Sequence, residues 1–323
     1  MTSTRLFLTL FLFSGALYGT GTAVQAGQLH ETYYVESSPE PSMIQKWSRL
    51  PGTRNFLFRV SAPSQTELEM IGRLERASLL QLESTTYPER TEIKAWQKLA
   101  SKGAQFIGLD LQLPNPEQIQ ILNEIGFSRI IFLMTYIPDT DEGRRLGQLN
   151  TPVSVTFATT SFPRYDDREL LLAIPKTVPL TFVGSYWPGY THMDLFNMLP
   201  NSKRLRISGE FPNDDQFPYL NNIDNLQELT IETSFAPPSP TVWEQIANRA
   251  TRWICRDWVP TEEELQDFAR SARPETGGTR NLIIDKDGEL FPEERARLER
   301  MQTPVEWVHS SAIGVQRRSR SVQ

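Results

Sequence analysis

Short strand-like segments recur along most of this chain at nearly constant spacing. Apolar or aromatic residues occupy every second position in each segment, which is typical of a strand with one buried face. Eleven such segments begin 22 to 29 residues apart, at Phe56, Leu80, Ile107, Ile131, Val153, Leu180, Leu205, Leu229, Trp253, Leu282 and Val305. A strand-containing unit that repeats at this period indicates stacked repeats.

Helix signals lie between many of these segments. Apolar residues at helical spacing follow N-cap residues such as Asn115, Ser239 and Thr261, with Pro or acidic residues in the first turn. No two-residue hairpin signal joins one strand to the next, so strands connected through helices are expected to be parallel. The chain is therefore expected to be of the α/β class.

Two architectures bury a parallel sheet of this kind. One is a closed eight-stranded barrel ringed by helices, and the other is an open solenoid in which each unit contacts only its neighbours. Eleven strands exceed the eight of such a barrel. The sequence therefore predicts an open, curved β/α solenoid over residues 55–310, with a (β/α)8 barrel as the alternative.

Residues 203–232 contain two copies of one unit, in which Leu205 and Ile207 return 24 residues later as Leu229 and Ile231. Together with Leu226, the second copy matches the LxxLxL pattern of leucine-rich repeats, and the chain resembles that family. The resemblance implies a horseshoe of stacked units with parallel strands.

The two ends of the chain differ from this repeating region. Residues 1–26 indicate a secretory signal peptide, with Arg5 before an apolar run and small residues before the expected cleavage site. The run is shorter than the roughly 20 residues that cross a bilayer, so we expect a secreted or periplasmic protein without a membrane span. Residues 27–54 are interpreted as an N-terminal cap or strap, and residues 311–323 as a disordered tail.

The net charge and the small number of cysteine and histidine residues limit the possible functions. The formal net charge is −6, which argues against nucleic acid as the partner. Cys255 is the one cysteine, and the three histidines are scattered. Asp285 to Glu294 imitate a calcium loop, but Ile283 takes the place of the first carboxylate ligand. No metal site and no cofactor are expected.

In a solenoid, the strand residues between core positions face the concave side. Around Phe132 this face turns apolar and aromatic, as interface centres do, although the N-terminal strap or a neighbouring helix could instead cover it. The expected binding residues are Phe132, Met134, Tyr136, Thr156, Val183, Arg206, Thr230, Glu232 and Arg256. We predict a non-catalytic recognition scaffold that binds a protein or a cell-envelope glycan on this face.

The barrel alternative carries a different function. Active sites of such barrels lie at the carboxyl ends of the strands, and two carboxylates at a suitable separation cleave glycosidic bonds. The candidate residues for a secreted glycoside hydrolase are Glu83, Asp110, Glu210 and Glu232, with Asp257 and Asp285 at equivalent strand ends. Acids at strand ends also serve as solvated loop residues and helix caps.

Overall fold

The structure, a computed structural model, describes most of the chain between residues 29 and 309. The described residues are 29–35, 39–49, 54–60, 62–75, 77–159, 161–213, 215–245, 250–270, 280–286, 289–301, 303 and 305–309. The predicted signal peptide and the predicted C-terminal tail lie outside this part of the chain.

Strands and helices alternate throughout. The strands are β1 (Leu29–Val35), β2 (Arg54–Arg59), β3 (Ala77–Ser84), β4 (Gln105–Leu109), β5 (Arg129–Met134), β6 (Val153–Phe157), β7 (Leu180–Gly184), β8 (Lys203–Ser208), β9 (Leu226–Thr233), β10 (Ala250–Arg256), β11 (Arg280–Asp285) and β12 (Val305–His309). The α-helices are α2 (Pro41–Arg49), α3 (Gln65–Ile71), α4 (Ile93–Ala100), α5 (Pro116–Ile125), α6 (Thr140–Arg145), α7 (Arg168–Leu172), α8 (Tyr190–Met198), α9 (Phe217–Asn221), α10 (Thr241–Gln245), α11 (Glu262–Arg270) and α12 (Pro292–Glu299).

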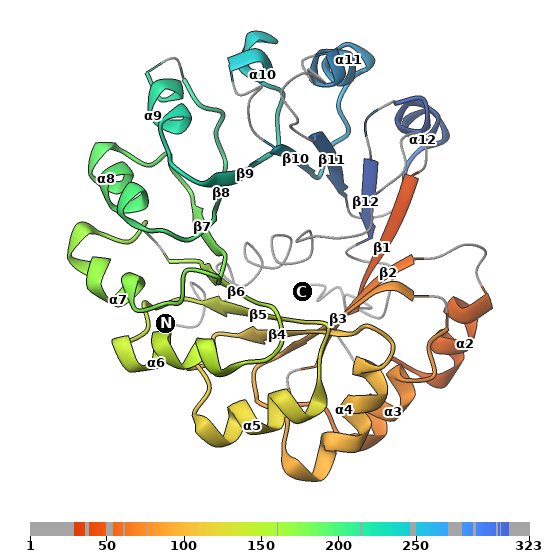
Figure 1. Cartoon of the computed structure of the whole chain (residues 1–323). Coiled ribbons are helices and arrows are strands. Elements are labelled where there is room, and N and C mark those ends of the chain that lie inside the picture. The colour runs from red at the N-terminus through yellow and green to blue at the C-terminus, as the bar shows by residue number, and fades with distance from the viewer. Residues whose placement is uncertain are drawn as a thin grey trace, which may run out of the picture.

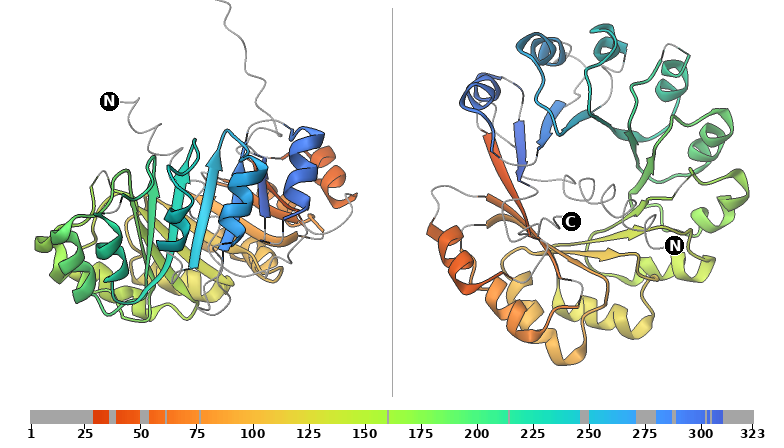
Figure 2. Two further views of the ribbon diagram at one scale, coloured as in Figure 1. Left: turned by 90° about the horizontal axis from the view of Figure 1, so that it is seen from above. Right: turned by 180° about the vertical axis from the view of Figure 1, so that it is seen from behind.

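The strands close into a single parallel barrel. Each strand pairs with its sequence neighbours, and β1 pairs with both β2 and β12, so the first and last strands join. The helices form a ring outside the strands, as Figure 1 shows along the barrel and Figure 2 shows from the side and from behind. The predicted open solenoid of stacked repeats is therefore wrong, because a solenoid leaves its terminal strands unpaired.

The closed ring has twelve strands rather than the eight of the barrel that we considered as the alternative. All eleven predicted segments are strands, β2 to β12. The twelfth, β1, comes from residues interpreted as a cap or strap, which instead contribute a strand and the outer helix α2. Barrel diameter grows with strand number, so twelve strands enclose a wider interior, here called the lumen, than eight would.

Helices begin where the sequence predicts them. Asn115 caps α5 by accepting a hydrogen bond from the backbone N–H of Gln118, and Pro116 occupies the first turn. Thr261 plays the same part before α11, where its hydroxyl accepts from the backbone N–H of Glu264 at 3.4 Å. These caps satisfy N–H groups that have no partner within their own helix.

The hydrophobic core lies mainly between the strands and the outer helices. Large aromatic residues fill it: the Phe182 and Phe196 ring centroids are 4.7 Å apart, and Trp243 lies 5.0 Å from Trp253. A second, smaller apolar cluster lines part of the lumen. Its members are Tyr34, Leu57, Ile107, Leu109, Ile131, Leu133, Ile254, Ile283 and Val308. Both faces of the barrel wall therefore carry buried apolar residues.

Candidate functional site: an arginine-lined pocket in the lumen

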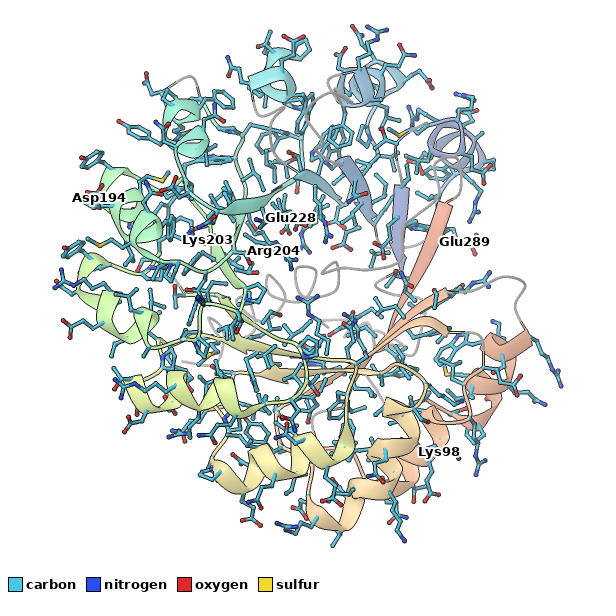
Figure 3. The ribbon with its side chains drawn as sticks, viewed as in Figure 1. Lys98, Asp194, Lys203, Arg204, Glu228 and Glu289 are labelled. Carbon is cyan, nitrogen blue, oxygen red and sulfur yellow. The ribbon has the colours of Figure 1, made fainter. Side chains whose placement is uncertain are left out.

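Polar residues form a belt on the inner wall, near the amino-terminal ends of the strands. Each one stands directly before a helix-facing core residue, so the alternation of side chains along a strand points it into the lumen. The members of this polar belt are Asn55, Gln105, Arg129, Ser154, Thr181, Arg204, Glu228, Arg252, Asn281 and Glu306. Figure 3 shows Arg204 and Glu228 inside the ring, whereas Lys98 and Asp194 lie on the outer helices.

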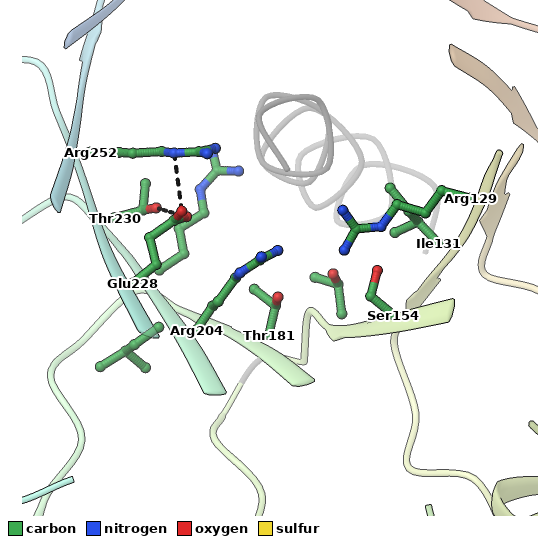
Figure 4. A pocket seen from close by; sticks show the side chains of 11 residues that line it. Arg129, Ile131, Ser154, Thr181, Arg204, Glu228, Thr230 and Arg252 are labelled. Carbon is green, nitrogen blue, oxygen red and sulfur yellow. Dashed lines mark hydrogen bonds and ion pairs between the residues drawn. The ribbon is translucent and has the colours of Figure 1, made fainter. Parts of the chain in front are cut away.

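One sector of the belt lines a hollow that is open to solvent, and the space between its lining atoms, open solvent included, is about 430 Å³. We call it the arginine pocket. It is lined by Arg129, Ile131, Ser154, Thr156, Thr181, Arg204, Leu205, Arg206, Glu228, Thr230 and Arg252. Figure 4 shows Arg129 reaching into the hollow from one side and Arg204 and Arg252 from the other, with Ser154 and Thr181 between them.

Positive charge dominates the arginine pocket. Arg252 forms an ion pair with Glu228 at 3.2 Å, and Thr230 donates a hydrogen bond to the same carboxylate at 3.4 Å. Burial lowers the pKa of Arg129 to about 10, and repulsion from Arg204 and Arg252 contributes in the same direction, opposed by Glu228. With a pKa of about 10 Arg129 stays protonated at neutral pH, but its charged form is less stable than in water, so a negative charge beside it would be favourable.

A buried network of arginines and carboxylates lies next to this pocket, toward the carboxyl ends of the strands. Glu232 on β9 accepts hydrogen bonds from Nε of Arg206 at 3.0 Å, from Ser208 at 3.1 Å and from Nε of Arg256 at 2.6 Å. Arg256 also forms an ion pair with Asp285 at 3.3 Å. Both oxygens of Glu232 are therefore held by guanidinium groups.

The two carboxylates of this network have opposite pKa shifts. Burial would raise the pKa of Glu232, but Arg206 and Arg256 outweigh that effect and hold it below its ordinary value. Burial raises the pKa of Asp285 to about 6, because Arg256 offsets only part of the desolvation while Glu232 and Asp257 add repulsion. At neutral pH the network holds an ionised Glu232 beside an acid that protonates in mildly acidic solution.

A third polar cluster joins the strands that close the barrel. Glu306 on β12 accepts hydrogen bonds from Thr32 on β1 and from Asn55 on β2, the latter at 3.4 Å. Ser78 on β3 donates to Asn55 at 2.9 Å. Burial raises the pKa of Glu306, while its two hydrogen-bond donors and the positive charge of Arg252 oppose that shift. The hydrogen bonds of this cluster satisfy polar side chains where the barrel closes, so we interpret the cluster as structural.

Five of the predicted binding residues lie together in the lumen. Thr156, Arg206 and Thr230 line the arginine pocket, and Glu232 and Arg256 belong to the adjacent network. Val183 faces the lumen between them, since it pairs with Arg206 across the two strands.

Phe132 and Met134 lie elsewhere. Both are fully buried on the helix-facing side of β5, within the main core, so their expected place on an inner binding surface is wrong. Tyr136 follows β5 and packs against the same core, and its hydroxyl accepts a hydrogen bond from the backbone N–H of Leu113 at 3.1 Å. The five residues of β5 that follow Arg129, up to Met134, are all apolar or aromatic, so periodicity could not show which face is inside.

The carboxylates at the strand ends differ in burial. Glu83, Glu232 and Asp285 are buried, whereas Asp110, Glu210 and Asp257 are exposed. Asp110 accepts a hydrogen bond from Thr135, and both Asp110 and Asp257 adopt positive φ angles, 50° and 62°. In the described part of the chain, these acids form no group with His or Cys that could hold a metal ion.

Sequence reasoning missed Arg129, Arg204 and Arg252. The available signal was their common position, each directly before a helix-facing core residue: Ile130, Leu205 or Trp253. In an open solenoid these side chains would be far apart along a ribbon. The curvature of a closed barrel turns them toward one another.

A scan of the chain against models of known protein families found no match, and a comparison with curated protein sequences found none either. Across the residues that the structure describes, no helix is long and apolar enough to cross a membrane. Function must therefore be argued from the chemistry of the lumen.

Proposed function

We propose that this chain is an exported, non-catalytic recognition protein that binds an anionic group of a glycan or protein partner in its lumen. The observation that carries the proposal is the convergence of Arg129, Arg204 and Arg252 on one hollow. Guanidinium groups repel one another, and bringing them together in a half-buried site costs free energy that a bound anion offsets.

Hydroxyl groups add to the anion-binding character of the pocket. Ser154, Thr156 and Thr181 lie on the strands between the arginines. Hydroxyls donate hydrogen bonds to oxyanions and also bind sugar hydroxyls, since each group is both a donor and an acceptor. The lining therefore suits an acidic carbohydrate better than an apolar ligand.

Calorimetric titration of the purified chain tests this function. The ligands are glucuronate, glucose 6-sulfate and glucose 6-phosphate, with glucose as the neutral control. We expect at least one acidic ligand to bind while glucose does not, and we expect Arg204→Gln to weaken that binding by about tenfold or more. Arg144→Gln on α6 removes the same charge at a side chain that is 69% exposed, and should leave binding unchanged. Equal binding by both variants would refute the proposal.

One observation favours a second candidate, a glycoside hydrolase. Asp285 and Glu232 lie in one network at the carboxyl ends of β11 and β9, with pKa values shifted in opposite directions. In glycoside hydrolases the surroundings raise the pKa of one carboxyl group, which acts as the acid, and keep the other ionised. Asp285 would be the acid here. Screening the wild type and Asp285→Asn on cell-wall and plant polysaccharides tests this candidate; equal hydrolysis by the two proteins would exclude it.

A further inference from the structure

Arg204 and Glu228 are neighbours on the inner wall of the barrel, yet they do not pair. They lie on β8 and β9, and their Cα atoms are register partners in the sheet. Opposite charges at such a position attract each other. Within the described part of the chain, however, Arg204 forms no ion pair or hydrogen bond, and Glu228 contacts Arg252 and Thr230 instead. Figure 4 shows Arg204 pointing into the hollow and Glu228 joined to those two residues.

Arg252 already interacts with two carboxylates. Its Nε lies 3.2 Å from Glu228, and its positive charge also lowers the pKa of Glu306 against the effect of burial. Arg204 has no carboxylate partner among the described residues, so it can bind a ligand without giving one up. A planar carboxylate presents two oxygens, which is the number that one guanidinium fork binds in parallel. Arg204 therefore suits a ligand carboxylate.

Glu228 can accept further hydrogen bonds. Its contacts with Arg252 and Thr230 are 3.2 and 3.4 Å long, whereas the saturated carboxylate of Glu232 accepts hydrogen bonds of 2.6 to 3.1 Å. An ionised carboxylate has about four positions at which it accepts hydrogen bonds. The side chain of Glu228 is 17% exposed, so a donor in the hollow can reach it. The wall thus places a hydrogen-bond acceptor beside the guanidinium of Arg204.

The surrounding charges indicate which donor the ligand carries. Arg204 on β8 and Arg252 on β10 flank Glu228 on β9, and both would repel an ammonium group. A neutral hydroxyl is not repelled, and the hydroxyls of Ser154 and Thr181 in the same lining can bond further hydroxyls. The carboxylate of Glu228 also disfavours a phosphate dianion beside it more than a carboxylate, which carries a single charge.

We propose that the ligand of the arginine pocket is a sugar acid, such as a uronic acid residue of a glycan, whose carboxylate binds Arg204 and whose hydroxyl donates to Glu228. This inference rests on the proposed lumenal recognition of an anionic group and names the chemical class of that group. Arg204 reads the acid, and Glu228 distinguishes a hydroxylated acid from other anions.

Calorimetric titration of the purified chain at pH 7 tests the ligand class. The ligands are glucuronate, glucose 6-phosphate and glucose 6-sulfate, with cyclohexanecarboxylate and 4-aminocyclohexanecarboxylate as ring acids that lack hydroxyls. We expect glucuronate to bind about tenfold more tightly than each of the others.

The other outcomes separate this inference from the proposed function. Equal or tighter binding of either ester would overturn the carboxylate assignment while leaving anion recognition intact. Equal or tighter binding of either cyclohexane acid would overturn the role of the hydroxyls. If no acidic ligand binds, both proposals fail.

Variants of the two residues assign their roles. Arg204→Gln should weaken glucuronate binding by about tenfold or more, and Glu228→Met, which removes both oxygens, should weaken it several-fold. Glu228→Met should not weaken binding of cyclohexanecarboxylate, because that acid has no hydroxyl to lose a partner and is relieved of repulsion. Arg144→Gln is the matched surface control.

Cooperative thermal unfolding establishes that each variant is folded. Glu228→Gln keeps the shape of the side chain and one oxygen, so it should fold and weaken glucuronate binding by a smaller factor. If folded Glu228→Met, or Glu228→Gln in its place, binds glucuronate as tightly as the wild type or more tightly, Glu228 does not accept a hydrogen bond from the ligand. The inference would then be wrong even if Arg204→Gln abolished binding.

Discussion

Arg206 on β8 and Glu232 on β9 form an ion pair in which each side chain is only 3% exposed. The two residues lie on adjacent strands, and Ser208 and Arg256 donate hydrogen bonds to the same carboxylate. A buried ion pair is favourable only when its remaining polar atoms are satisfied as well, and these additional donors meet that condition for Glu232. The network therefore holds β8, β9 and β10 together from inside the barrel.

Glu232→Gln should destabilise the protein by about 3 kcal/mol, because it leaves two guanidinium groups beside a neutral side chain in a buried site. Urea unfolding followed by circular dichroism measures this change in the free energy of unfolding. Glu169→Gln is the matched control, since the carboxylate of Glu169 is 79% exposed in its ion pair with Arg168. The control should differ from the wild type by less than about 0.5 kcal/mol. Similar effects of the two substitutions would contradict a structural role for the buried network.

Asp285 should stabilise the folded state more in mildly acidic solution than at neutral pH. Its pKa is raised from 3.8 to about 6 in the folded protein, so between these values the folded state binds a proton that the unfolded state does not. This contribution is fully present below the unfolded value and is lost as the pH rises through about 6. On lowering the pH from 7.5 to 5, the contribution of Asp285 to the free energy of unfolding should increase by about 1 kcal/mol.

Urea unfolding of the wild type and of Asp285→Asn at both pH values isolates this contribution. The stability difference between the two proteins should favour the wild type more at pH 5 than at pH 7.5. Asp194→Asn on α8 controls for loss of a carboxylate, because Asp194 is exposed. A stability difference that is the same at both pH values would contradict the raised pKa.

The strand pattern was predictable because the outer face of each strand packs against a helix. Apolar residues at every second position, such as Leu205 and Ile207, mark that face, and the N-cap residue Asn115 marks the start of a helix. Closure of the barrel was not predictable from these local signals. It depends on β1, where Tyr34 faces the lumen and Val35 faces the helices, so adjacent apolar residues obscure the period of two.

Which residues line the lumen could be predicted only in part, because adjacent apolar residues can hide which face of a strand is inside. A shift of one residue reverses the two faces of a strand. In β8 the alternation of arginine with apolar residues settles the choice, and Arg206 was correctly placed on the inner face. In β5 the lumen-facing Ile131 and Leu133 are as apolar as the helix-facing Phe132, so the choice made from the sequence was wrong. The convergence of Arg129 with Arg204 and Arg252 depends on barrel curvature, which no local pattern encodes.

Phe132→Ala should therefore lower stability without acting directly on a ligand site. Phe132 is fully buried in the core between β5 and the helices, and removing a buried phenyl ring costs about 3 to 5 kcal/mol. Phe235→Ala, at a side chain that is 48% exposed, should cost much less. Thermal and urea unfolding of both variants compare the two sites. An unchanged stability of Phe132→Ala would contradict its helix-facing position.

Gly184→Ala tests the packing at the carboxyl end of β7. A Cβ atom at Gly184 would lie 2.4 Å from the ring of Phe162, and Phe162 is itself held by edge-on contacts with Tyr186 and Phe196. The ring cannot move without disturbing these neighbours, so the substitution should destabilise the protein by about 1 to 3 kcal/mol.

Gly189→Ala is the matched control, because its Cβ would meet no atom closer than 3.9 Å. Urea unfolding measures both variants, and the double variant Gly184→Ala/Phe162→Leu should recover part of the loss because leucine gives the new methyl group room. Failure of the single substitution to destabilise, or a double variant that is worse by the full cost of both changes, would show that Phe162 does not lie against Gly184.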